Sequence, residues 1–291
     1  MKVKKLFNNK YFKLVIKILF TVVCFYLVFI KINIVEIGKI IKSADFLFIL
    51  LATLFFILSK YLSAVRLQLF FNAIHLPISL GLNLRLYLLG MFYNLFLPGG
   101  IGGDGYKAYY LKRRNKDIPL RKIIQALLFD RINGFVVLGI LALVVFYFID
   151  FDFPYKLILI IAGIVSLLVL SMLVLYFFLR EAVEKYFVLF VYSIGVQVSQ
   201  FITALFIIFS LHISEHIIEM AFVFLISTIT VMIPLTIGGT GIRELTFVYG
   251  EKYFHYNKDY SVTVAVLFFI ITTLISLGGI YYSVRPDKLE S

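Results

Sequence analysis

The chain has 291 residues, of which 62% are hydrophobic and only 15% are charged, and its mean hydropathy is +1.01. Soluble domains are roughly half apolar and about a quarter charged, so this composition excludes an ordinary soluble protein and indicates an integral membrane protein. The net charge of +12 comes from basic residues in short loops beside apolar runs, a pattern typical of cytoplasmic loops rather than of a nucleic-acid partner. The single cysteine, Cys24, excludes a disulfide within the chain and a cysteine metal site.

Long apolar runs predict about six membrane-spanning helices, since a helix needs about 20 apolar residues to cross a bilayer. The predicted spans lie at about 14–30, 44–65, 123–149, 157–178, 187–211 and 261–284. No small-residue cleavage site follows the first run, so we interpret it as a span and not as a signal peptide. Residues 31–43 are expected to form an external loop. Basic residues before the first span and after the last one predict a multi-pass protein of the cell membrane with both termini in the cytoplasm.

One short pattern occurs twice in the chain. Residues 98–107 read PGGIGGDGYK and residues 234–243 read PLTIGGTGIR, so both copies share Pro-x-x-Ile-Gly-Gly-x-Gly-x followed by a basic residue. Glycines and prolines that break apolar segments at corresponding places in two halves are typical of transporters built from repeats. Backbone released from a helix at membrane depth must line a cavity or be buried in protein. We therefore interpret the two copies as the walls of one substrate site.

The charges of the flanking loops predict that each copy belongs to a re-entrant hairpin. The strongly basic block at 107–122 is expected in the cytoplasm, so residues 82–106 leave the cytoplasm and return to it. The direction of the later spans then makes 217–243 a hairpin that enters from outside. The predicted fold is an all-α polytopic membrane protein with a single transmembrane domain, 1–291, in which units 44–149 and 186–284 form an inverted repeat.

The glycine clusters and the nearby charges are the predicted substrate site. Glycine permits positive φ and close approach of a ligand, and a helix that begins after it directs free N–H groups at an anion. Charges at membrane depth are costly and are functional candidates by default. The predicted substrate-binding residues are Gly102, Gly103, Asp104, Gly105, Lys107, Arg131, Gly238, Gly239, Gly241, Arg243 and Glu244, with Arg85 and Asp130 as auxiliary contacts. Two alternatives stay open: close helix packing at the glycines, and a pair at the cytoplasmic interface for Asp130 and Arg131.

No other pattern predicts catalysis or a cofactor. Neither glycine cluster matches the Gly-x-x-x-x-Gly-Lys-Ser/Thr loop that binds nucleotides. His212, Glu215, His216 and Glu219 recur on one helical face, where a solvated outer turn is favoured over a zinc site. We expect no catalytic residue, no metal and no cofactor.

The motif residues resemble those of a known family. The stretch NLFLPGGIGGDGYK at 94–107, followed by YLKR at 110–113, looks like the lysylphosphatidylglycerol synthase transmembrane region, also called the flippase-like or UPF0104 family. DRING at 130–134 and PLTIGGTGIRE at 234–244 are similar to its other recurrent segments, in the same order. The resemblance implies a polytopic helical protein associated with moving lipids between leaflets. The synthases also carry a soluble domain that transfers an amino acid from tRNA to lipid; the chain ends soon after its last span, so the resemblance is to stand-alone members.

These observations together predict a lipid translocase whose substrate is a membrane lipid with an anionic or polyprenyl-linked headgroup. The family also suggests a lipid synthase or a glycosyltransferase as a protein partner. Two alternatives remain: a membrane-embedded transferase acting on an aminoacyl- or glycosyl-lipid, with Asp104, Asp130 and Glu244 as its candidate carboxylates, and an accessory subunit of a synthase. The sequence predicts no oligomeric state.

Overall fold

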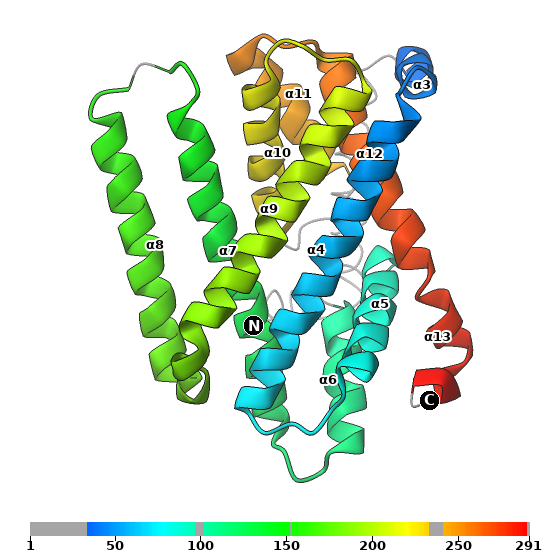
Figure 1. Ribbon diagram of the computed structural model, residues 1–291, viewed down its shortest axis with the longest axis vertical. Helices are drawn as coiled ribbons and strands as arrows, with labels where there is room; N and C mark the ends of the chain where they lie inside the picture. Colours follow the sequence, from blue (N-terminus) through cyan, green and yellow to red (C-terminus); the bar gives the residue numbers. More distant parts are fainter. Residues whose placement is uncertain (1–33, 97–101, 152, 233–240, 290–291) are drawn as a thin grey trace, which may run out of the picture.

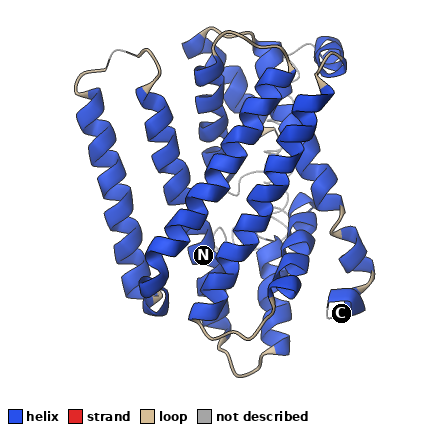
Figure 2. Cartoon of the chain, viewed as in Figure 1, coloured by secondary structure: helices blue, strands red, loops and turns tan. Residues whose placement is uncertain are grey.

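The computed structural model describes residues 34–96, 102–151, 153–232 and 241–289. Within these ranges every regular element is helical and no strand occurs (Figure 2). This confirms the predicted all-α class.

Five of the described helical segments are long and apolar enough to cross a membrane. They are α4 (Phe46–Ala73), α7 (Leu120–Tyr147), α8 (Lys156–Phe178), α9 (Tyr186–Ser210), preceded by the 3₁₀ helix η1 (Arg180–Lys185), and α12 (Lys258–Leu277). They correspond to five of the predicted spans, whereas the span at 14–30 lies outside the described residues. Only 11% of the most apolar stretch of α8 is buried, as expected for a helix that has lipid as its solvent. The chain is a multi-pass membrane protein.

Two pairs of shorter helices form hairpins at opposite ends of the molecule. The first hairpin consists of α5 (Leu80–Phe96) and α6 (Gly102–Arg114), which pack against each other in the lower half of Figure 1. The second consists of α10 (Ile217–Met232) and α11 (Ile242–Phe254), which pack together in the upper half. The connections at 97–101 and 233–240 lie outside the described residues, and entry of these hairpins into a membrane stays a prediction.

The contacts between helices are equivalent in the two halves of the chain, if α4, α5 and α7 are taken to correspond to α9, α10 and α12. Helices α4 and α9 cross each other in the most extensive helix pair of the described chain. Helix α7 packs against α9 and α10, and α12 makes the corresponding contacts with α4 and α5. Such a correspondence is expected if α4–α7 and α9–α12 are equivalent units. The inverted repeat of 44–149 and 186–284 remains a prediction that this packing favours.

The structure differs from the prediction in two segments near α4. Helix α4 continues for two turns beyond the predicted end at residue 65, because the buried Arg66 finds partners inside the protein. Residues expected in an external loop form α3 (Ile34–Lys42), which buries Ile37 and Ile40 and packs on α12.

The last predicted span, 261–284, is interrupted after α12. A Cβ at Gly279 would lie 2.5 Å from the carbonyl oxygen of Leu88 on α5, so this close approach requires glycine. The chain continues as α13 (Ile280–Val284) and the 3₁₀ helix η2 (Pro286–Leu289), beside α5.

Candidate functional site

Asp104 joins the first hairpin to the neighbouring span. It lies in the first turn of α6, where its Oδ1 accepts a hydrogen bond of 3.2 Å from Lys107 Nζ and its Oδ2 accepts one from Arg131 Nε of α7. Lys107 is only 5% exposed and turns toward α5, with Nζ 4.4 Å from the ring centroid of Tyr87. The fold thus brings three predicted site residues together, and Asp104 orients the guanidinium of Arg131.

A groove of about 790 Å³ runs between α6 and α7. The α7 side is an apolar stripe of Leu120, Ile124, Leu127, Leu128, Ile132 and Phe135, and Met232 at the end of α10 also borders the groove. The α6 side carries Asp104, Gly105, Ala108, Tyr109, Lys112 and Arg113. Arg131 lies next to the apolar stripe, so the groove presents cations beside a long apolar surface. Such a surface can hold an amphiphile that has an anionic head.

Two cations of this groove, Lys112 and Arg113, are not among the predicted site residues. Lys112 Nζ donates to the carbonyl oxygens of Lys116 and Ile118 at 2.6 and 3.0 Å. Arg113, the next residue, is exposed. The sequence signal that could have identified Arg113 is helical spacing. Gly105, Tyr109 and Arg113 are four residues apart, so they share a face of α6.

The glycines of the first copy have different roles. A Cβ at Gly103 would lie 2.1 Å from the carbonyl oxygen of Gly90, so these two glycines let α5 and α6 pack closely. Close packing, the alternative left open from the sequence, therefore accounts for Gly103. A Cβ at Gly105 would meet nothing within 4 Å, and Gly105 lines the groove. Gly102 begins α6.

The described end of the second copy, residues 241–243, caps and begins α11. Gly241 has φ 83°, a conformation that glycine adopts readily, and its N–H donates to Glu244 Oε2 at 2.8 Å. The buried Arg243 donates from Nη1 to Ser227 Oγ and Thr228 Oγ1 at 3.0 and 3.1 Å. Its guanidinium also lies 5.1 and 4.7 Å from the ring centroids of Phe224 and Phe268. Gly238 and Gly239 lie outside the described residues.

The two copies line different cavities in the part of the chain that the structure describes. Arg243 and Glu244 border a smaller cavity of about 180 Å³, together with residues of α4, α9, α10 and α12. Val231 lines this cavity and the next residue, Met232, lines the groove, so the end of α10 lies between the two. A single site with both copies as its walls stays a prediction, because the intervening turns are not among the described residues.

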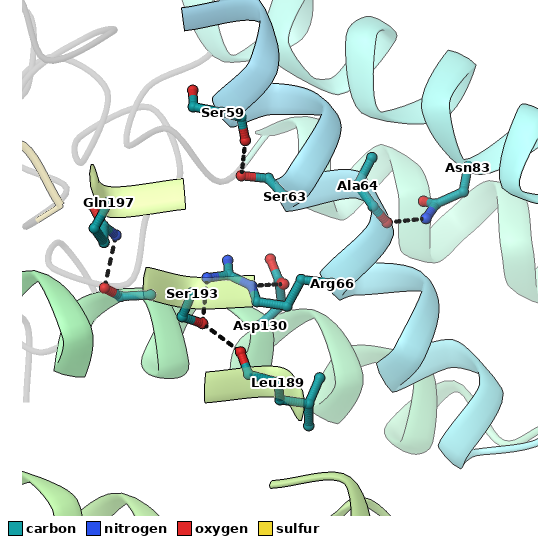
Figure 3. Close-up of polar contacts among 10 residues, drawn as sticks. Ser59, Ser63, Ala64, Arg66, Asn83, Asp130, Leu189, Ser193 and Gln197 are labelled. Atoms are coloured by element: carbon teal, nitrogen blue, oxygen red, sulfur yellow. Dashed lines mark hydrogen bonds and ion pairs between the residues drawn. The ribbon is translucent and has the colours of Figure 1, made fainter. Parts of the chain in front are cut away.

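Asp130 belongs to a buried network between α4, α7 and α9 (Figure 3). Its Oδ1 accepts a hydrogen bond of 2.7 Å from Arg66 Nε, and Arg66 Nη1 donates to Ser193 Oγ at 2.9 Å. Gln197 Nε2 donates to the carbonyl oxygen of Gly134 at 2.8 Å, in the same region. Asp130 and Arg66 are 8% and 5% exposed, so Asp130 faces the protein interior whereas Arg131 faces the groove. The two residues thus lie in different surroundings, which does not agree with the interfacial pair that the sequence left open as an alternative.

Two other predicted groups lie away from both cavities. Arg85 Nη1 donates to the carbonyl oxygens of Lys288 and Leu289 at 3.4 and 3.2 Å, which fastens the C-terminal segment to α5. His212, Glu215 and His216 line a separate surface pocket of about 350 Å³. In the four described ranges, no group of three or more His, Cys, Asp or Glu side chains is placed to hold a metal ion.

The fold and the groove define a helical, multi-pass membrane protein with a surface suited to an amphiphile. The family model described as the lysylphosphatidylglycerol synthase TM region matches residues 14–187 and 183–279. The chain therefore belongs to this family. It is also 29% identical over 153 residues to the UPF0104 membrane protein PH1989 of Pyrococcus horikoshii, an alignment that covers 51% of this chain and 44% of that protein. The chain thus spans less than half the length of the curated relative it matches.

Proposed function

We propose that this protein moves an anionic lipid between the leaflets of its membrane, with the headgroup held at the cationic edge of the α6–α7 groove. The observation that carries the proposal is the arrangement of Arg131 beside an apolar stripe that is open to the surroundings. Ile124 and Leu128 of this stripe are 41% and 51% exposed. On a membrane-spanning helix these side chains would contact acyl chains while the headgroup contacts the guanidinium.

The basic residues around the groove favour an anion and not a zwitterion. Lys112, Arg113 and Arg131 line the groove with one carboxylate, Asp104. Arg131 is already oriented by that carboxylate, so little rotamer freedom is lost when it binds a phosphate. The family supports a lipid substrate, because its description refers to a lipid-modifying synthase.

The transferase alternative receives less support from the carboxylates. Asp104 accepts from Lys107 and Arg131, Asp130 accepts from Arg66, and Glu244 caps α11. Each of these three carboxylates is therefore already engaged by groups of the chain itself, which leaves it less available to a substrate. Transport also agrees with two opposed hairpins, which would expose a bound headgroup to each side in turn.

The test is translocation of a headgroup-labelled anionic lipid by the purified chain in liposomes, read by a membrane-impermeant quencher. Quenching beyond the outer-leaflet half is expected. Arg131→Gln should slow the quenching of the inner-leaflet lipid at least about tenfold. A charge-assisted hydrogen bond contributes about 1.5–3 kcal/mol, and about 1.4 kcal/mol is a factor of ten.

The matched control is Lys252→Gln, which removes the same charge from an exposed position on α11. It should translocate the lipid at the parental rate. Quenching that stops at the outer-leaflet half for anionic and polyprenyl lipids would contradict the proposal, and conversion of the labelled lipid into a new product would favour the transferase.

A further inference from the structure

We infer that the smaller cavity is an anion site in which Lys60 and Arg243 bind one singly charged phosphate ester group. The cavity of about 180 Å³ has five polar side chains on its walls: Lys60, Gln200, Arg243, Glu244 and Thr272. The inference concerns this cavity alone and holds whether or not the groove carries lipid.

Lys60 is the reason to expect a ligand. It lies near the middle of the apolar helix α4, where a charge is costly unless it has a partner. Its Nζ lies 4.5 Å from the ring centroid of Phe56, and no described residue offers it a hydrogen bond or a carboxylate within 4.0 Å. A cation left in this state inside a membrane-spanning bundle destabilises the protein until an anion arrives.

The opposite wall is already oriented for such an anion. Arg243 is fixed by the hydroxyl groups of Ser227 and Thr228 and by two aromatic rings, so its position does not depend on a ligand. The Oγ1 of Thr272 is buried, has no hydrogen-bond partner among the described residues and adds a donor on the cavity wall. Oriented donors lose little entropy on binding, which raises affinity.

The charges and the volume of the cavity limit the kind of anion. In their ordinary ionisation states Lys60 and Arg243 contribute two positive charges, and Glu244, whose Oε2 accepts from the Gly241 N–H, contributes one negative charge. One negative charge on the ligand therefore neutralises the site, as in a phosphate diester. A water molecule needs roughly 10–15 Å³ of comparable volume, so the cavity accommodates a phosphate group but not a lipid with its chains.

A tryptophan reporter makes binding measurable, since the chain contains no tryptophan. Phe269 lines the cavity and is only partly buried, so Phe269→Trp places an indole beside the site. The reporter protein in neutral detergent is titrated with dimethyl phosphate, a soluble diester. In a second arm, nanodiscs that contain phosphatidylglycerol are compared with nanodiscs of phosphatidylcholine alone.

Saturable fluorescence changes are expected, and Lys60→Gln in the reporter background should weaken binding at least tenfold while Lys252→Gln leaves it unchanged. A response to both probes, lost in Lys60→Gln, supports the site with a lipid headgroup as its ligand. A response to dimethyl phosphate alone, also lost in Lys60→Gln, supports the site with a soluble anion as its ligand. No response to either probe, or a response that Lys60→Gln leaves unchanged, overturns the inference.

Thermal unfolding distinguishes an anion site from a structural lysine. Without ligand, Lys60→Gln removes an uncompensated charge and should raise the melting temperature by about 2–4 °C for each kcal/mol gained. The variant should also lose the stabilisation that dimethyl phosphate gives the parent. A melting temperature that falls on substitution would assign Lys60 a structural role and contradict the site.

Discussion

At the scale of residues, neighbours in the sequence take part in different interactions. Asp130 and Arg131 are adjacent on α7, but Asp130 pairs with Arg66 inside the protein while Arg131 joins Asp104 at the groove. Consecutive side chains on a helix point about 100° apart, because a turn contains 3.6 residues. The DRING segment therefore contributes to the stability of the helix crossing and to the groove at the same time.

The buried pair of Arg66 and Asp130 gives a prediction for single and double substitutions. Asp130→Ala leaves a guanidinium buried without its charge partner, so we expect a loss of about 3–5 kcal/mol in stability. The double variant Arg66→Met with Asp130→Leu removes both charges and should recover most of the loss. Thermal unfolding in detergent measures both effects. Equal losses in the single and double variants would show that packing, and not charge pairing, dominates at this crossing.

At the scale of elements, the two helices of the first hairpin approach each other closely at one contact between their backbones. Gly103 of α6 meets Gly90 of α5, and the Gly103 N–H also donates to Asn94 Oδ1 at 2.8 Å. This contact sets the distance between the two helices and so the position of Asp104, one residue later. The geometry of the groove thus follows from a position that does not line it.

Two alanine substitutions on the same helix test this contact. Gly103→Ala forces α5 and α6 apart and should destabilise the protein by about 1–3 kcal/mol, the usual range for overpacking. Gly105→Ala meets nothing within 4 Å and gains helix propensity, so its stability should be equal or slightly higher. Melting temperatures of the two variants are compared with that of the parent. If both substitutions were tolerated equally, the close approach of the hairpin helices would not be required.

At the scale of the whole molecule, the two hairpins lie at opposite ends (Figure 1). Helix α6 ends at one end of the molecule and α11 ends at the other. Helix α7 packs against α10 as α12 packs against α5, which agrees with two related units. If the units are inverted in the membrane, the ends of α6 and α11 face opposite compartments.

Cysteine accessibility tests this orientation. In a background with Cys24 replaced by serine, single cysteines at Lys112 and Lys252 should react with an impermeant thiol reagent from opposite sides of the membrane. The positive-inside rule predicts that the position at Lys112 is cytoplasmic. Labelling of both positions from the same side would contradict the inverted repeat.

The sequence alone determined the membrane class, the five described spans, the helices on either side of both glycine clusters, and the family. These features are local, because hydropathy and helix breaks are written in consecutive residues. The tertiary structure alone decided the partner of Asp130, the packing role of Gly103, and the cavity that joins Lys60 to Arg243. The partner of Asp130 and the cavity depend on helices distant in the chain, and the role of Gly103 depends on how closely two consecutive helices pack. A buried charge takes its partner from whichever helix packs beside it.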